Sequence, residues 1–170
     1  MFCDDFNDGV LSTGWTYVKP NWTESGGLLA GAPTGRKAIA IATPIFSGCS
    51  NCTVKAEMQT GGGAGNRVWL LAWYVDKKNT VELLMKEEND FWVLKQKSNG
   101  SVVAKAKGAA TIDPNTIYDA KIVFDGNQFQ LYVNNTLLIT LPKGAGTNPN
   151  GTIGFQSKLT TGSFDSIDVN

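Results

Sequence analysis

The sequence predicts an all-β fold built as an antiparallel β-sandwich, and three observations lead to this prediction. Short segments with alternating apolar residues recur along the whole chain at a spacing of about 8–12 residues. Turn-forming residues separate these segments, and glycine alone occurs 19 times. Few segments have Leu, Ala, Glu and Lys at helical spacing. The 170 residues suit one domain, 1–170, with a substantial core.

The N-terminal part predicts short strands among long polar connections. The first 35 residues contain a short strand, an open loop and a small hairpin around a Gly-Gly pair. Residues 38–42 form a small strand in which Ile39 and Ile41 are expected to point inward. Residues 53–59 alternate strictly between apolar and polar side chains, as a strand with one buried face does.

The middle of the chain, residues 66–107, predicts four consecutive strands that form the central sheet. Their ranges are 68–75, 80–86, 91–97 and 102–107. The connections are three or four residues long and rich in Asn, Asp and Gly, which tolerate the positive φ angles of tight hairpins. Strand 68–75 is apolar on both faces, so one face is expected to build the core and the other could build a site.

The C-terminal part continues the same pattern of short strands. The apolar positions that mark them fall within 118–124, 129–133, 137–141, 153–155 and 163–169. Asp-Gly and Asn-Asn pairs turn the chain between several of these strands. The total of about a dozen short strands matches an antiparallel sandwich.

Charge and hydropathy exclude several classes of partner. The formal net charge is zero, so no electrostatic footprint for nucleic acid or an anionic membrane is visible. No apolar run approaches the ~20 residues that span a bilayer. The first residues lack a basic segment followed by an apolar one, so a signal peptide is not predicted. The chain is then either cytosolic or a mature domain of a longer secreted precursor.

The three cysteines give information on the redox state of the compartment in which the protein occurs. Cys49 and Cys52 form a C-x-x-C motif, and Cys3 lies far away in the sequence. A zinc site would need further ligands, but the chain has no His and only one other Cys. A redox motif would open a helix beside a βαβ unit, which the pattern does not show. The sequence therefore predicts a Cys49–Cys52 disulfide in an oxidising, extracellular compartment, with Cys3 free or competing as a partner.

Several stretches together resemble concanavalin A-like, laminin-G-like jelly-roll domains. They are Asp5-Phe6-Asn7-Asp8-Gly9, Trp73-Tyr74-Val75-Asp76, Leu131-Tyr132-Val133-Asn134-Asn135, Gly151-Thr152-Ile153-Gly154-Phe155 and Phe164-Asp165-Ser166-Ile167-Asp168-Val169. The resemblance covers nearly the whole chain and implies a jelly-roll sandwich. Lectins, carbohydrate-binding modules and glucanases share this fold, but the Glu-x-Asp-x-Glu run of the glucanases is absent from this sequence.

A sugar-binding surface is the leading functional prediction. Flat aromatic rings stack on the apolar faces of sugars, and neighbouring polar groups bind the hydroxyls. If the hairpin turns at residues 76–79, Trp73 lies opposite Glu82 on the outer face. The predicted site consists of Trp73, Glu82, Lys86, Trp92 and Lys95. The alternative is that these tryptophans pack in the core, as most buried aromatics do.

Carboxylates near the two chain ends suggest a structural calcium site. Terminal strands of sandwiches commonly pair, which would bring Asp5 and Asp165 together as the expected ligands. Hard oxygen ligands suit Ca²⁺, and the related jelly rolls imply such a site. The alternative is that these are solvated turn carboxylates.

The sequence thus predicts a non-catalytic glycan-binding module of an extracellular protein, with a polysaccharide or oligosaccharide as its partner. A hydrolase or lyase of the same fold is the second interpretation, with Glu82 as its carboxylate. A His-dependent mechanism is excluded because the chain has no His. The third interpretation is a structural or adhesive domain without a sugar site, which would show a flat apolar patch and pairing edge strands.

Overall fold

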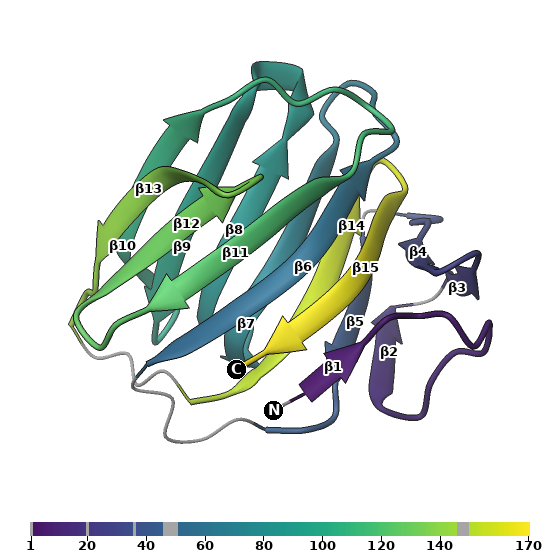
Figure 1. Cartoon of the computed structure of the whole chain (residues 1–170), viewed down its shortest axis with the longest axis horizontal. Helices are drawn as coiled ribbons and strands as arrows, with labels where there is room; N and C mark the ends of the chain where they lie inside the picture. Colours follow the sequence, from purple (N-terminus) through teal and green to yellow (C-terminus); the bar gives the residue numbers. More distant parts are fainter. Residues whose placement is uncertain (1, 20, 36, 46–50, 146–149) are drawn as a thin grey trace.

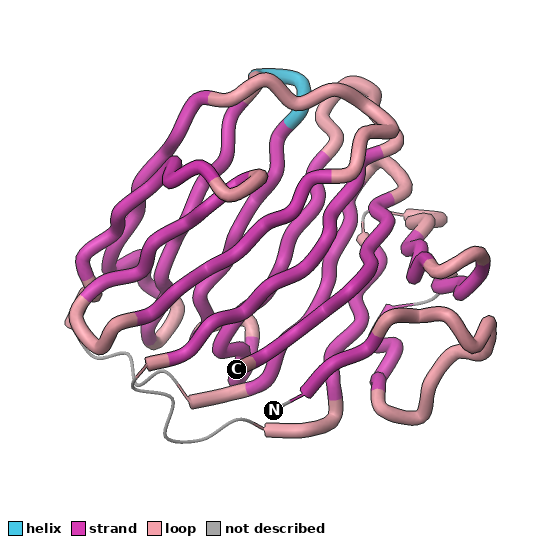
Figure 2. The backbone as a smooth tube through the Cα atoms, viewed as in Figure 1, coloured by secondary structure: helices cyan, strands magenta, loops and turns pink. Residues whose placement is uncertain are grey.

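The computed structural model describes all residues except 1, 20, 36, 46–50 and 146–149. Two antiparallel sheets pack face to face as a β-sandwich (Figure 1), which confirms the predicted all-β, jelly-roll fold class. Strands make up nearly all of the regular structure (Figure 2), with one short 3₁₀ turn at Glu87–Asn89. Within the described ranges, no helix has the length and hydropathy needed to cross a membrane.

Sheet A contains eight strands and sheet B contains seven. In spatial order, sheet A consists of β13 (Thr136–Pro142), β12 (Gln128–Val133), β11 (Tyr118–Phe124), β6 (Cys52–Thr60), β15 (Gly162–Val169), β4 (Leu28–Gly31) and β3 (Trp22–Ser25), with β1 (Phe2–Asp4) also paired to β15. Sheet B consists of β10 (Ser101–Ala109), β9 (Phe91–Ser98), β8 (Asn79–Lys86), β7 (Arg67–Asp76), β14 (Thr152–Lys158), β5 (Ala38–Ala42) and β2 (Trp15–Lys19).

Several neighbouring strands in each sheet come from distant parts of the chain. In sheet A, β15 lies beside β6, and in sheet B β14 lies beside β7. The N-terminal β1 pairs with the C-terminal β15, so the two chain ends lie side by side (Figure 1). Consecutive strands β7 to β10 form the predicted central hairpins of sheet B.

Aromatic rings from both sheets fill the space between them. Phe155 of β14 stacks on Phe164 of β15, with 4.0 Å between the ring centroids. Phe155 also stacks on Trp15, at 5.1 Å. Offset stacking of this kind adds about 0.5–1.5 kcal/mol per pair beyond the burial of apolar area. The core is therefore continuous from one sheet to the other.

The prediction that Ile39 and Ile41 point inward is wrong. In β5 the alanines at 38, 40 and 42 are buried in the core, while Ile39 and Ile41 are half-buried on the outer face. Ala40 lies opposite Phe155, and Ala42 lies opposite Trp15. Small side chains fit next to these large rings, so ring volume and not hydrophobicity alone decides which face is buried.

A wide bulge in β7 changes the register of the first central hairpin. The β7–β8 ladder passes from the Ala72–Val81 pair directly to the Asp76–Asn79 pair. Three residues of β7, 73–75, therefore lie opposite a single residue of β8, residue 80. Trp73 takes a φ of 46°, a left-handed conformation that is rare for a bulky side chain. The extra residues break the simple alternation of the strand and turn Trp73 to the other face.

The bulge makes the predicted role of Trp73 wrong. Its side chain is 3% exposed and packs edge-on against Phe124 and Phe129, at centroid distances of 5.9 and 5.3 Å. Leu71, and not Trp73, lies opposite Glu82. Trp73 is therefore part of the core between the sheets, where its ring cannot stack on a ligand.

Trp92 is also a core residue, contrary to the predicted site. It lies opposite Met85, which faces inward, and is fully buried. Its ring meets Tyr118 of sheet A edge-on, with 5.9 Å between centroids. Directly opposed residues in a ladder share one face, so Trp92 had to follow Met85 into the core.

Candidate functional site

The outer face of sheet B carries two adjacent hollows. The first, called the Trp69 hollow, has a volume of about 200 Å³ and is lined by Lys37, Ile39, Trp69, Leu71, Tyr74, Lys77, Glu82, Lys95, Lys97 and Gln156. The second, called the Phe91 hollow, has a volume of about 210 Å³ and is lined by Arg67, Glu82, Leu84, Lys86, Phe91, Val93, Lys95 and Lys105. Glu82 and Lys95 line both hollows, so the two form one continuous surface, here called the sheet-B face.

Regular strand alternation places Trp69 on this face. Val68 and Leu70 are buried in the core, so Trp69 between them points outward. It lies opposite Leu84 on β8 and Gln156 on β14. The indole is 7% exposed and lines the hollow, with the Lys37 ammonium 5.8 Å from the ring centroid. Trp69 therefore supplies an aromatic wall that is partly covered by one flexible lysine.

Glu82 is held between two lysines at the centre of the face. It lies directly opposite Lys95 in the β8–β9 ladder, and the two charged groups are 2.5 Å apart. Its other oxygen accepts a hydrogen bond from Lys97, also at 2.5 Å. The Glu82 side chain is 11% exposed, and the two lysine side chains are 24% and 23% exposed. Such charge-assisted bonds in a poorly hydrated layer fix the positions of all three groups.

Burial and neighbouring charges set the ionisation of two further groups in the Trp69 hollow. Burial, and secondarily the charge of Asp76, raises the pKa of Tyr74, so its hydroxyl stays protonated and can donate a hydrogen bond. Burial lowers the pKa of Lys37, and Lys97 lowers it further by repulsion, against the opposing attraction of Glu82.

Cations also surround the aromatic ring of the Phe91 hollow. The ammonium of Lys107 lies 3.8 Å from the Phe91 ring centroid, and that of Lys86 lies 5.3 Å from it. Lys86 also donates a hydrogen bond to Asn89. Such cation–π contacts hold flexible lysines near the ring and keep the positive charge at the surface.

Three of the five predicted site residues lie on the sheet-B face, and two do not. Glu82, Lys86 and Lys95 line the hollows, whereas Trp73 and Trp92 are in the core. The prediction missed Trp69, although its alternation with inward-facing neighbours indicated an outward ring. The role of the three correctly placed residues in binding stays a prediction.

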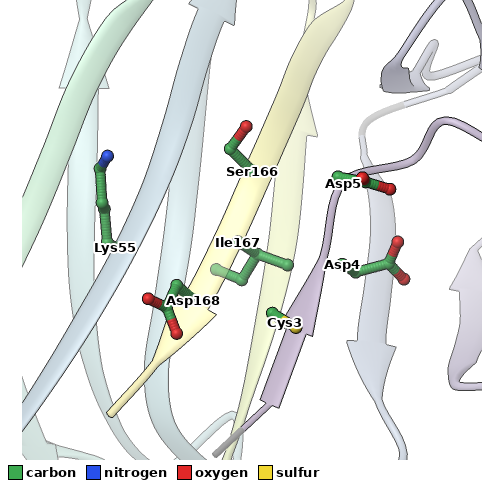
Figure 3. A pocket seen from close by; sticks show the side chains of 7 residues that line it. All are labelled: Cys3, Asp4, Asp5, Lys55, Ser166, Ile167 and Asp168. Carbon is green, nitrogen blue, oxygen red and sulfur yellow. The ribbon is translucent and has the colours of Figure 1, made fainter.

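Carboxylates from the two chain ends, Asp4, Asp5 and Asp168, line one hollow. β1 pairs with β15, so Asp4 lies opposite Ile167, and Asp5 follows at the edge of a hollow of about 450 Å³ (Figure 3). Asp4 already accepts hydrogen bonds from the Trp15 indole at 2.8 Å and from a backbone N–H. Asp165 lies opposite Glu57 on β6, outside the lining of that hollow.

Within the described part of the chain, no group of three or more Asp, Glu, Cys or His side chains is placed to hold a metal ion. Asp5 and Asp165 therefore belong to no such group, and the structure does not test whether they bind calcium. Calcium binding stays a prediction that a melting-temperature comparison with and without calcium would decide.

The predicted disulfide falls partly outside the described residues. Cys49 is not described, so the structure does not test its pairing with Cys52. Cys52 is buried at the start of β6. Cys3 is a free, exposed cysteine on β1.

Comparison with known proteins gives the family. The model of the 3-keto-alpha-glucoside-1,2-lyase-like domain matches residues 2–170. The chain belongs to this family. Its membership makes the chain a carbohydrate-related domain. No curated protein matches the sequence.

Solved structures show that this family member has the concanavalin A-like jelly-roll fold. The carbohydrate-binding module CBM66 from Bacillus subtilis has a TM-score of 0.77 and 22% identity, over 93% of this chain and 96% of that one. The Bacillus licheniformis β-glucanase has a TM-score of 0.77 and 11% identity, over 98% and 95%. The Crh5 transglycosylase has a TM-score of 0.80 and 12% identity, over 98% and 82%. At these identities the likeness shows the fold alone.

Proposed function

We propose that this domain binds saccharides without transforming them, and that the sheet-B face is the binding surface. The observation that carries the proposal is the Trp69 hollow, where an outward-facing indole lies beside ordered polar groups. Flat aromatic rings bind the apolar face of a sugar, and fixed polar groups select its hydroxyls. The carbohydrate-related family and the shared fold of the CBM66 module support this reading.

Each group in the hollow has a role in the proposed complex. The sugar ring lies against Trp69, and Lys37 moves aside along its flexible stem. Glu82 accepts hydrogen bonds from hydroxyls, while Tyr74 and the Gln156 amide donate them. Glu82 and Lys95 are fixed by their ion pair, so little ordering is needed when the ligand binds.

A sugar-active lyase is the second candidate, because the family is named for one. Glu82 would be its carboxylate. Among the described residues that line the two hollows, it is the single acidic group, and both of its oxygens contact lysines. The pair of carboxyl groups that glycoside hydrolysis generally uses is therefore not assembled by these residues. A lyase eliminates instead of hydrolysing and needs a base with an open oxygen that accepts a proton, whereas both oxygens of Glu82 are already held by ammonium groups. Binding is the function that this geometry supports best.

Replacing the ring tests the proposal. Trp69→Ala removes the stacking surface but leaves the core cluster intact, so the protein stays folded. We expect glycan affinity to fall about ten-fold or more, because one stacked ring contributes about 1–3 kcal/mol. The measurement is affinity electrophoresis against a panel of soluble polysaccharides, with an assay for cleavage products in the same samples.

The matched control is Tyr132→Ala, which removes a half-buried ring from sheet A. Its affinity is expected to equal that of the unaltered protein. Unchanged affinity in folded Trp69→Ala protein would remove the sheet-B face as the site. Cleavage products that disappear in Glu82→Gln protein would replace binding by the lyase function.

A further inference from the structure

Positive charge is concentrated on the sheet-B face although the chain as a whole is neutral. The chain has 15 basic and 15 acidic residues. The basic residues of the Trp69 hollow are Lys37, Lys77, Lys95 and Lys97. The Phe91 hollow adds Arg67, Lys86 and Lys105. Among the described residues that line this surface, seven are basic and one, Glu82, is acidic.

Glu82 does not neutralise this excess. It already pairs with Lys95 and Lys97, so even this central cluster carries a net positive charge. Lys37 and Lys105 form no ion pair with any carboxylate of the described residues. Lys86 reaches Glu88 only at 3.9 Å, and that carboxylate is 45% exposed. Like charges held this close repel one another, and an added anion would relieve the repulsion.

Two of these cationic side chains, Arg67 and Lys37, show in more detail how the positive groups are placed. The Nε–H of Arg67 is buried and has no hydrogen-bond acceptor among the described residues. Burial lowers the pKa of Lys37, the attraction of Glu82 opposes this, and repulsion from Lys97, Lys158 and Lys95 adds to the lowering. The Arg67 guanidinium also lines the Phe91 hollow, and a guanidinium beside several ammonium groups is a suitable donor set for carboxylate or sulfate oxygens.

We infer that the ligand of the sheet-B face is an acidic saccharide, one that carries carboxylate or sulfate groups. This inference rests on the proposed saccharide-binding function and specifies its ligand. One sugar ring would occupy the Trp69 hollow, and the anionic group of a neighbouring ring would reach the cations of the Phe91 hollow. Each hollow is smaller than the ~300–1,000 Å³ typical of small-molecule pockets, which suits an extended chain lying across both.

The same face is less suited to nucleic acid. Glu82 lies at the junction of the two hollows, where it would repel a continuous phosphate backbone but accept hydrogen bonds from sugar hydroxyls. Sequence-tolerant binding of single strands uses several aromatic rings on which successive bases stack. Each hollow here has one such platform, Trp69 or Phe91, and membership of a carbohydrate-related family favours the saccharide.

Polymers that differ only in charge test the inference. Polygalacturonate is compared with its fully methyl-esterified form, and dextran sulfate with dextran, by isothermal titration calorimetry. We expect the acidic member of at least one pair to bind about ten-fold or more tighter than its neutral partner. Which pair shows the difference distinguishes carboxylate from sulfate. Raising the salt from about 0.1 M to about 1 M shortens the screening length from about 10 Å to about 3 Å and should remove the difference.

Two variants locate the charges, and a third is the control. Lys37→Gln and Lys105→Gln should each weaken acidic binding about three- to ten-fold and change neutral binding much less. Lys121→Gln removes a matched lysine, which lies 4.7 Å from the Tyr132 ring centroid on sheet A. This control should bind as tightly as the unaltered protein.

The outcomes distinguish failure of the acidic-ligand inference from failure of the proposed saccharide-binding function. Equal binding of acidic and neutral polymers, both lost in Trp69→Ala, would overturn the acidic ligand and keep saccharide binding. Absence of binding to any polymer of either charge, or binding insensitive to Trp69→Ala, would remove the proposed function itself. Single-stranded DNA that binds as tightly as the acidic polymers and weakens in Lys37→Gln would overturn the saccharide in favour of polyanions in general.

Discussion

Glu82 and Lys95 lie directly opposite each other on β8 and β9, and their charged groups are 2.5 Å apart. Lys97 donates a hydrogen bond to the second carboxylate oxygen of Glu82. One largely buried carboxylate therefore holds two lysines in place on a face that is otherwise positive. The arrangement links the stability of sheet B to the shape of its outer surface.

Glu82→Gln should lower the free energy of unfolding by about 2 kcal/mol, because it leaves two partly buried ammonium groups without their counter-charge. The value lies below that for a fully buried pair because the lysines are about a quarter exposed. Urea denaturation measures the change. Glu57→Gln is the control, since Glu57 lies opposite Asp119 and Asp165 and its loss removes repulsion. Equal stability of Glu82→Gln and unaltered protein would show that the ion pairs contribute little.

Trp73→Ala should mainly reduce stability, whereas Trp69→Ala should mainly reduce glycan binding. Trp73 is 3% exposed among Phe124 and Phe129, so its removal leaves a cavity and should cost about 3–5 kcal/mol of unfolding free energy. Trp69 is also largely buried, but it lies outside the core cluster between the sheets and lines a hollow, so its removal should cost less. Chemical denaturation gives both values. A stable Trp73→Ala protein with weakened glycan binding would reverse the assignment of the two rings.

These two tryptophans show how far the sequence predicts the site. Alternation predicts the fold and the outward direction of Trp69, because Val68 and Leu70 on either side are apolar and buried. The direction of Trp73 depends on the bulge before Asp76, and no residue pattern announces a positive φ at a tryptophan. A shift in register moves a side chain to the other face of a sheet, so this single feature misplaced the centre of the predicted site.

The error at Trp92 has a different origin. Met85 is buried in the core, and the pairing of β8 with β9 places Trp92 directly opposite it, on the same face. The sequence alone does not give the register of that hairpin, because its connection contains a 3₁₀ turn followed by Asp90 in a left-handed conformation. Polar residues were easier to place. Glu82 and Lys95 are on the outer face because a charged side chain is rarely buried in an apolar core.

The Cys49–Cys52 disulfide remains a prediction with a direct test. Mass spectrometry of the unreduced protein should show the loss of two hydrogens, and a maleimide should label one cysteine, the exposed Cys3. Reduction should then release two further thiols. Such a bond would support an extracellular, oxidising location, because disulfides are rare in reducing compartments. Three reactive thiols before reduction would contradict the pairing.

A carboxyl pair near the N-terminus should make stability depend on pH. Glu24 on β3 is 8% exposed, and its Oε1 accepts a hydrogen bond from the Gly9 N–H at 3.1 Å. Burial, followed by the hydrogen bond and charge of Asp8, raises the pKa of Glu24 above 4.5. The Val10 N–H, followed by Glu24, lowers the pKa of Asp8 below 3.8. When the pair carries one proton, these directions place it on Glu24.

The sign of the effect follows from these two directions. The raised pKa of Glu24 contributes stability that is fully present below pH 4.5 and is lost as the pH rises through the folded-state value. The lowered pKa of Asp8 contributes stability above pH 3.8 that is lost as the pH falls. Glu24→Gln keeps the acceptor for Gly9 and supplies a permanent N–H to Asp8, so it imitates protonated Glu24 at every pH. Urea midpoints from pH 4 to 8 should therefore fall in the unaltered protein relative to Glu24→Gln as the pH rises. Parallel profiles for the two proteins would show that the pKa of Glu24 is the same in the folded and unfolded states, which would contradict its upward shift.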